Sequence, residues 1–176
     1  MLSSKKIIKS TFILFTLLGT LKGFAADYIA VDQNSCGRMK DGVESFVLVL
    51  KTGEKLQEGI IKCATDAHLL GASVHGIGQF LNPTFAYYGP NEKPQIITLD
   101  GIYEVISLNG NISLSDTHYY THIHAVLGNN KLEAHAGHIK ESTIGATAEL
   151  VITPFSKPLV RDVNSDTGFG PIVTAD

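Results

Sequence analysis

Two histidine motifs, Thr121-His122-Ile123-His124 and His135-Ala136-Gly137-His138, lie on either side of a short polar turn. They contain four of the seven histidines of the chain. The flanking residues are typical of β-strands, so the two motifs predict a hairpin with histidines on both strands. Imidazole is a common metal ligand and titrates near neutral pH. The cluster therefore indicates a metal site, a proton-handling site or a polar patch at a subunit contact.

The arrangement of these histidines depends on the turn between the strands. Residues two apart in a strand share a face, so His122 and His124 point the same way. A two-residue turn at Asn129-Asn130 places His124 opposite His135, whereas a bulge places His122 opposite His138. In either register a third imidazole comes within cross-strand distance of the first two.

Three imidazoles with an open fourth position are the arrangement of a catalytic or exchangeable zinc site. Water, His75 or Glu104 could fill the fourth position if the fold brings it near. In a catalytic site the metal would lower the pKa of a bound water, and Glu104 or His135 would move the proton. Other catalytic patterns are weak. The serines lack a GxSxG context, and no helix with a third glycine follows Gly76-Ile77-Gly78.

The first 25 residues have the composition of a secretory signal peptide. Lysines form a basic start, the apolar run Thr11–Leu21 follows, and Gly23 and Ala25 place small side chains before a cleavage site. The apolar run is short for a membrane span, although an uncleaved anchor is the alternative. We therefore expect an exported protein, periplasmic or secreted, with no membrane association after cleavage.

Removal of residues 1–25 would change the charge balance. The full chain has 14 lysines and arginines against 17 aspartates and glutamates. Four of the lysines and none of the acids fall in residues 1–25, which leaves 10 basic against 17 acidic residues, a net charge of −7 with histidine neutral. Affinity for nucleic acid comes from lysine and arginine displacing counterions from phosphates, so the charge predicts no nucleic-acid partner.

The remaining residues, about 150, suffice for one domain with its own core. We expect an irregular leader over residues 26–43 and a folded domain over residues 44–176. Cys36 and Cys63 are the only cysteines of the chain. In an oxidising compartment they suggest one disulfide, which would stabilise the fold by roughly 3–4 kcal/mol. The alternative is that Cys63 is a buried thiol on the apolar face of a helix.

The apolar spacing predicts one helix among several strands. Ser45–Leu50 is a compact, β-rich run, and the residues after it repeat at helical spacing from Leu56 to an end at Gly71. Turns are predicted at Asn109-Gly110 and at Gly128–Lys131. The further strand segments are Ala72–Leu81, Gln95–Leu99, Ile102–Leu108, Thr121–Leu127, Leu132–Ile139 and Ala146–Ile152. About seven strands and one helix predict an α+β domain with a mostly antiparallel sheet.

The order of several motifs resembles a known family. The segments Thr52–Leu56, Gly71–Gly78 and Leu99–Ser113 are followed by His122-Ile123-His124 and Gly137-His138. Their joint order and spacing resemble the plant and prokaryote conserved (PPC) domain, which occurs in plant nuclear proteins that also carry AT-hooks. The resemblance covers about residues 44–157 and extends to the tail Arg161–Val173.

This resemblance implies one sheet with a packed helix, assembled as a homotrimer. It also implies that His122, His124 and His138 bind a divalent metal, zinc or a similar ion, because they match the histidines of bacterial members. His135, Glu104 and His75 are then the candidates to support these ligands from outside the metal's own contacts. His75 stands where a small residue is more usual in the family.

The plant members bind DNA through separate basic AT-hooks, and this chain has no Arg-Gly-Arg-Pro core. The plant partner-contact motif corresponds to Gly101–Ile106, where Ile102 replaces its arginine. The resemblance therefore predicts neither DNA binding nor a plant-type transcription-factor contact.

Three hypotheses follow for the function. The first is a trimeric, metal-binding module that acts through protein or small-molecule contacts without established catalysis. The second is a zinc-dependent hydrolase or lyase that acts on a small molecule. The third is a structural trimer whose histidines only line the subunit contact. The sequence contains no substrate-selecting signature, so the binding module is the preferred prediction.

Overall fold

The computed structural model describes Cys36 and residues 45–89, 93–116, 118–164 and 166–173. The chain divides into the units Met1–Ala30 and Val31–Asp176, and all the described residues belong to the second. The predicted signal peptide lies outside the described residues, and so does the predicted leader apart from Cys36. In the described part of the chain, no helix has the length and apolar character needed to span a membrane.

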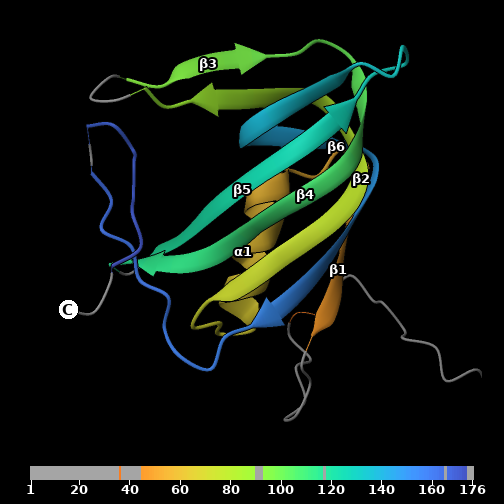
Figure 1. Cartoon of the computed structure of the whole chain (residues 1–176). Coiled ribbons are helices and arrows are strands. Elements are labelled where there is room, and N and C mark those ends of the chain that lie inside the picture. The colour runs from red at the N-terminus through yellow and green to blue at the C-terminus, as the bar shows by residue number, and fades with distance from the viewer. Residues whose placement is uncertain (1–35, 37–44, 90–92, 117, 165, 174–176) are drawn as a thin grey trace, which may run out of the picture. The chain divides into compact units, whose positions relative to one another are not determined.

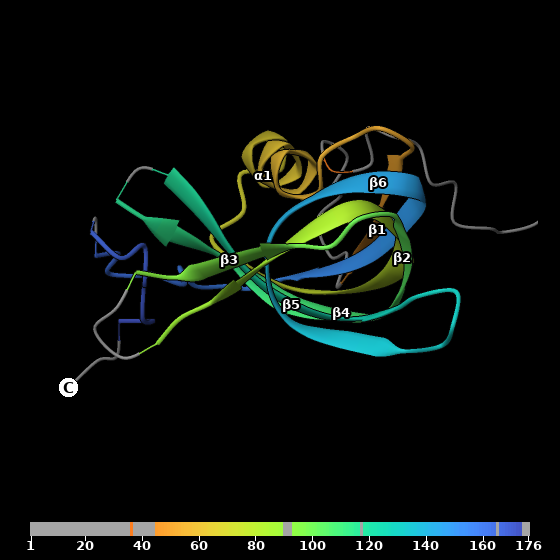
Figure 2. The same ribbon diagram turned by 90° about the horizontal axis from the view of Figure 1, so that it is seen from above.

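The described residues form one helix and six strands. They are β1 (Phe46–Lys51), α1 (Leu56–Asp66), β2 (Ala72–Tyr87), β3 (Gln95–Thr98), β4 (Ile102–Ser115), β5 (His118–Gly128) and β6 (Ala134–Pro154). The strands form an antiparallel sheet in the order β1-β6-β5-β4-β2-β3. β6 also pairs with β2, so β2, β4, β5 and β6 form a closed ring of pairings. With α1 against one face of this sheet (Figures 1 and 2), the predicted α+β class is confirmed.

The core lies between α1 and the sheet. Leu56 and Ile60 of the helix are fully buried, at the three- to four-residue spacing that gives a helix one apolar face. Alternate residues of the strands meet them; on β5 these include Ile123 and Leu127, each with no exposed surface. Because strand residues alternate between faces, the histidine between Ile123 and Ala125 points to the other side of the sheet.

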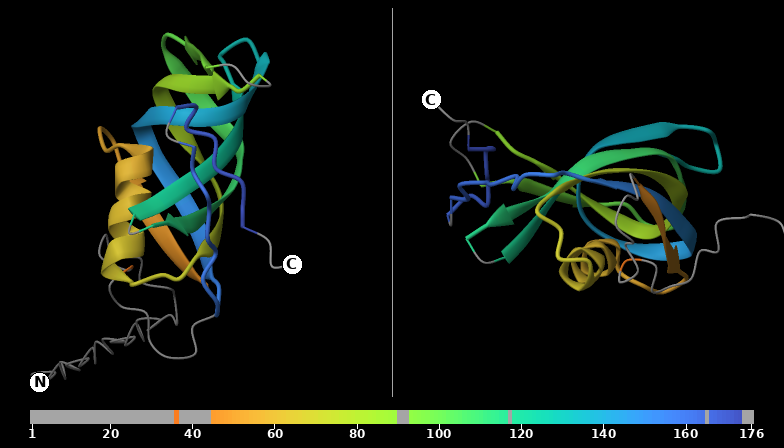
Figure 3. Two further views of the ribbon diagram at one scale, coloured as in Figure 1. Left: turned by 90° about the vertical axis from the view of Figure 1, so that its left-hand side faces the viewer. Right: turned by 90° about the horizontal axis from the view of Figure 1, so that it is seen from below.

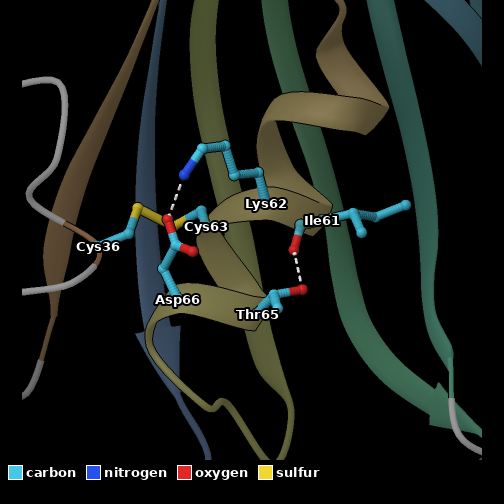
Figure 4. Close-up of a disulfide and its surroundings, with 6 residues drawn as sticks. All are labelled: Cys36, Ile61, Lys62, Cys63, Thr65 and Asp66. Carbon is cyan, nitrogen blue, oxygen red and sulfur yellow. Dashed lines mark hydrogen bonds and ion pairs between the residues drawn. A yellow bond between two sulfur atoms is a disulfide. The ribbon is translucent and has the colours of Figure 1, made fainter.

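A disulfide joins Cys36 to Cys63 on α1, with the two Cα atoms 5.1 Å apart (Figure 4). Both cysteines are buried, so Cys63 does not remain a free thiol. Near the bridge Thr65 donates its hydroxyl hydrogen to the Ile61 carbonyl oxygen at 2.8 Å. The bridge therefore ties a residue ahead of β1 to the last turns of the helix.

The helix ends at Asp66, earlier than the predicted end at Gly71. The amide of Leu69 still donates to the carbonyl of Ala64. His68, however, has φ 50°, and this left-handed conformation takes the chain out of the helix. Leu69 stays buried after the helix has ended, which explains why the apolar spacing continued past its true end.

The predicted turn at Asn109-Gly110 is wrong. β4 runs straight through both residues and pairs with β2 on one side and β5 on the other. A β-carbon on Gly110 would lie 2.2 Å from the His122 carbonyl oxygen and 2.9 Å from Ile123 Cα. Glycine is needed here because the neighbouring strand passes very close, and not because the chain turns.

β2 and β6 are longer than predicted. β2 continues past Leu81 to Tyr87, and β6 is one strand where two were expected. The register of β2 shifts between Gly76 and Gly78 and again between Leu81 and Thr84. Such bulges break the alternation of inward and outward residues, so one bent strand resembles separate short ones in the sequence.

The turn between β5 and β6 is longer than a two-residue hairpin. Asn129 Oδ1 accepts hydrogen bonds from the amides of Lys131 (2.9 Å) and Glu133 (3.0 Å), which closes a wider loop. His124 therefore pairs with His138. Both registers considered from the sequence are wrong, yet the true one also brings a third imidazole to the face of the first two.

The segment after β6 passes the end of β4. Single bridges pair Leu114 with Val160 and Arg161 with Ile172, and the Arg161 amide donates to the Leu114 carbonyl at 2.8 Å. In the left panel of Figure 3 this segment, drawn in blue, and α1 lie on opposite sides of the sheet. The segment thereby brings Arg161 and Phe169 to the face that carries the histidines.

Candidate metal centre

His122, His124 and His138 form a compact group on the sheet face opposite α1. The nitrogens that could bind a metal all lie within 4.8 Å of one another. The ring centroids are 5.1 to 5.3 Å apart in all three pairs. His138 faces His124 directly across the strands, and His122 is its diagonal neighbour. We call these three residues the triad.

The spacing of the triad fits one shared ion. Nε2 of His122 and Nε2 of His124 are 3.2 Å apart. Two nitrogens bound at about 2.0–2.1 Å to a tetrahedral ion are separated by about 3.3–3.4 Å. His122 and His138 are half-buried and His124 is exposed, so the group is reachable from solvent.

Two triad imidazoles are neutral near pH 7. Burial lowers the pKa of His122 below its ordinary value of 6.5, and the charges of Arg161 and His124 lower it further. The pKa of His138 falls to about 4, first because of burial and then because of the other two imidazoles, Lys140 and Arg161. A metal binds the neutral ring, so neither imidazole has to lose an imidazolium proton before binding.

Arg161 lies behind the triad and is only 5% exposed. Its Nε donates to Ser113 Oγ at 2.9 Å, Nη2 donates to Asn111 Oδ1 at 2.9 Å, and Nη1 donates to the carbonyl of Gly170. Among the described residues, no carboxylate contacts the guanidinium. The group is therefore a buried positive charge whose described partners are all neutral.

Arg161 also sets the tautomer of one triad member. Its Nη2 lies 3.3 Å from Nδ1 of His122. A guanidinium only donates, so this Nδ1 is the acceptor and the proton of the ring is on Nε2, directed at His124. For a metal to bind His122 at Nε2, the ring proton has to move to Nδ1, where it would face the Arg161 guanidinium.

A cavity of about 530 Å³ opens beside the triad. Its wall comes from β2, β3, β5, β6 and the segment after β6, and much of it is aromatic. The aromatic members are Phe85, Tyr87, Tyr88, Tyr120 and Phe169. The Tyr88 and His138 rings meet edge to face, with centroids 5.3 Å apart. An apolar cavity with a few polar groups at one place is the usual form of a small-molecule site.

Two of the predicted supporting residues lie away from the triad. His135 is opposite Leu127, shares its face of the sheet, and meets the ring of Tyr103 at a centroid distance of 5.5 Å. Glu104 accepts a hydrogen bond from Gln79 Nε2 at 2.7 Å and does not line the cavity. The predicted roles of His135 and Glu104 behind the ligands are therefore wrong.

His75 lies in the same cross-strand row as His124, but two strands away. It pairs with Asn109, which in turn pairs with His124. His75 Nδ1 and Asn109 Oδ1 form a hydrogen bond of 2.8 Å. Because Asn109 stands between them, His75 does not serve as a fourth ligand.

Neither Arg161 nor the aromatic wall was predicted from the sequence as part of the site. Arg161 is one of two arginines in the chain, and it follows β6 in a segment without apolar periodicity. Its rarity was the only available signal. The cavity joins residues from distant parts of the chain, and no local pattern marks them as neighbours.

A family model described as the Plants and Prokaryotes Conserved (PCC) domain matches residues 37–156. The chain belongs to this family. The PPC resemblance predicted from the sequence is thus confirmed, and the matched stretch contains the whole triad. Arg161 and Phe169 lie beyond its end.

Solved structures share the PPC fold. A PPC protein from Pyrococcus horikoshii is 26% identical with a TM-score of 0.68, over 78% of this chain and 99% of that one. A proposed DNA-binding protein from Bacteroides thetaiotaomicron is 23% identical with a TM-score of 0.70, over 77% and 94%. A metal-containing protein from Archaeoglobus fulgidus is 24% identical with a TM-score of 0.66, over 75% and 94%. A comparison with curated proteins found no match.

Proposed function

We propose that this PPC-domain protein is an exported homotrimer that binds a divalent metal, zinc or a similar ion, through His122, His124 and His138. In this proposal it acts as a binding or association module for a protein or small-molecule ligand. The supporting observation is the convergence of three imidazoles at metal-ligand spacing on the wall of an aromatic cavity. A metal held by three protein ligands leaves a position for water or a ligand, and it would polarise the group bound there.

Exposed apolar side chains on the triad face support self-association. Ile77, Ile106 and Val151 are 56%, 60% and 42% exposed, and they line one shallow groove that crosses β2, β4 and β6. A continuous exposed apolar surface is typical of a protein contact. The PPC resemblance gives further copies of this chain as the occupant. Light scattering coupled to size-exclusion chromatography should give three times the mass of one chain; the mass of a single chain would contradict the trimer.

Nucleic acid is not part of the proposed function, although the Bacteroides neighbour is a proposed DNA-binding protein. After the predicted cleavage, 17 acidic residues face 10 basic ones. Such a chain gains little from counterion release on a phosphate backbone. Export, which the basic and apolar start of the chain supports, would also separate the protein from the DNA of the cell.

The cavity favours a second candidate, a metal-dependent hydrolase or lyase that acts on a small molecule. The residues predicted to move its proton, Glu104 and His135, contact Gln79 and Tyr103 instead. Among the described lining residues there is no carboxylate to replace them. Burial raises the pKa of the lining residue Tyr120, with a further contribution from Tyr88, so its phenol stays protonated at neutral pH. The binding module therefore remains the conclusion.

Metal content is the first test. The protein would be purified without chelator or affinity tag and measured by inductively coupled plasma mass spectrometry. About one zinc or similar ion per chain is expected, because one triad offers one site. Absence of metal, persisting after incubation with zinc, would contradict both the metal module and the metal-dependent enzyme and leave an association domain.

A further inference from the structure

The wall of the cavity next to the triad has a positive charge directly behind it. Arg161 contacts Tyr120, His122 and Gly170, and all three line the cavity. No described carboxylate offsets this charge. An uncompensated charge away from water is costly, and an anion in the adjacent cavity would reduce that cost.

A metal bound to the triad would add to the excess of positive charge at this end of the cavity. Its three ligands are imidazoles, two of them half-buried, and they bring no negative charge to a divalent ion. The rest of the described wall is apolar or aromatic, with Gln95 as a further polar side chain. The cavity thus combines a positive end with an apolar body, and the matching ligand combines an anionic group with an apolar one.

We propose that this cavity binds a small carboxylate that carries an aromatic or branched apolar group. The carboxylate lies at the triad, on the side of Arg161, and the apolar group packs against Phe85, Tyr88 and Phe169. The inference rests on the proposed metal site and names the class of ligand that the site takes. A cavity of about 530 Å³ is within the range of small-molecule sites, roughly 300–1,000 Å³.

Inorganic phosphate fits this cavity less well. It needs many hydrogen-bond donors around it, and the described wall provides mostly rings and aliphatic groups. It would also leave that apolar surface in contact with water. A carboxylate with one ring satisfies the positive end and covers the wall at the same time.

The test uses isothermal titration calorimetry on the protein purified from its host in its natural form, loaded with zinc. The probe is 3-phenylpropionate, and the matched probe is its neutral amide, 3-phenylpropionamide, which has nearly the same shape. Acetate keeps the charge without the ring, and inorganic phosphate is the competing anion. We expect 3-phenylpropionate to bind at least tenfold more tightly than each of the other three.

Two variants test which residue interacts with the carboxylate and which with the apolar group of the ligand. Arg161→Gln should weaken 3-phenylpropionate at least fivefold and leave the amide unchanged. Phe169→Ala should weaken 3-phenylpropionate and leave acetate unchanged. Phe155→Ala is the matched control, because it removes a partly exposed ring that does not line the cavity. If Arg161→Gln fails to fold, the four probes on the unaltered protein still decide.

Metal content measured on the same samples separates this inference from the proposed function. With one metal per chain, equal binding of carboxylate and amide, or no binding of either, overturns the ligand class and leaves the metal module intact. Phosphate that binds more tightly than 3-phenylpropionate also overturns it. If no metal is bound but the carboxylate is still preferred tenfold, the proposed function fails and the anion site at Arg161 stands.

Discussion

The two faces of β5 carry opposite chemistry on alternate residues. On the α1 side, Ile123 and Leu127 have no exposed surface, and each contributes about 1.5–3 kcal/mol through apolar burial. On the other side, His122 and His124 line the cavity and carry nitrogens that could bind a metal. Alternate residues of β5 thus serve the folded core on one face and the proposed ligand site on the other. Substitutions on the first face should change stability, and those on the second should change ligand binding.

The largest effect is expected for Ile123→Ala. This residue is fully buried in the core, so loss of its side chain leaves a cavity and should lower the free energy of unfolding by about 2–5 kcal/mol. Urea unfolding of the metal-free protein, followed by circular dichroism, measures this change. His124→Ala on the same strand is the control and should cost less than about 1 kcal/mol. Equal losses in the two variants would remove the distinction between the faces.

The disulfide stabilises the same side of the sheet as the core. The double variant Cys36→Ala/Cys63→Ala opens a loop with a sequence separation of 27 and should lower the free energy of unfolding by about 3.5 kcal/mol in the chain-entropy model. Metal stoichiometry should not change, because the bridge lies on α1 and the triad is on the opposite face. The same urea titration, with a metal assay on the folded protein, measures both. Loss of metal without loss of stability would contradict this separation.

The sequence predicted the parts of both faces that depend on local pattern. The apolar spacing of α1 and the alternation along β5 are periodic, so the linear sequence displays them. The later Gly-His motif is likewise visible in the sequence. The period of two placed His122 and His124 on one face in any register, and the family resemblance supplied His138 as the third member. The wider loop at Asn129 only decided which histidine of the second motif stands opposite His124.

The parts that the sequence did not predict depend on contacts between distant residues. Asn109-Gly110 has the composition of a turn, but strands on both sides of β4 hold it extended. Arg161 comes from a segment without periodicity, and only the fold places it 3.3 Å from His122 Nδ1. The aromatic wall likewise combines β2 with the C-terminal segment. Local pattern therefore predicted a histidine cluster and the family resemblance selected its three members, whereas their electrostatic surroundings required the structure.

A sharper test of the cavity face is the pair His122→Ala and His118→Ala. Both residues lie on β5 and are four apart, so they share a face, but only His122 belongs to the triad. Loss of one of three ligands should weaken zinc affinity at least a hundredfold, about 2.7 kcal/mol. His118→Ala should bind zinc like the unaltered protein. Competition with a chromophoric chelator measures both constants, and retained affinity in His122→Ala would refute the site.

The smallest expected effect is the change of stability with pH. Here a residue of the triad face alters the free energy of unfolding. The pKa of His138 is about 4 in the folded protein and near 6.5 when the chain is unfolded. Between these values the unfolded chain binds more protons. The stability of the metal-free protein should therefore be unaffected by this residue above pH 6.5 and fall as the pH drops from 6.5 toward 4. His122, whose pKa is also lowered, acts in the same direction.

Comparing His138→Gln with the unaltered protein isolates the contribution of His138 to this pH dependence. The carboxylates that titrate in the same pH range are present in both proteins. Its ring is only half-buried, so solvent screening reduces the expected difference to about 1 kcal/mol between pH 7 and pH 4.5. Urea midpoints in the presence of a chelator, taken at both pH values, give the comparison. A smaller loss in His138→Gln than in the unaltered protein is expected. Parallel losses would mean that His138 titrates in the folded protein as it does in the unfolded chain.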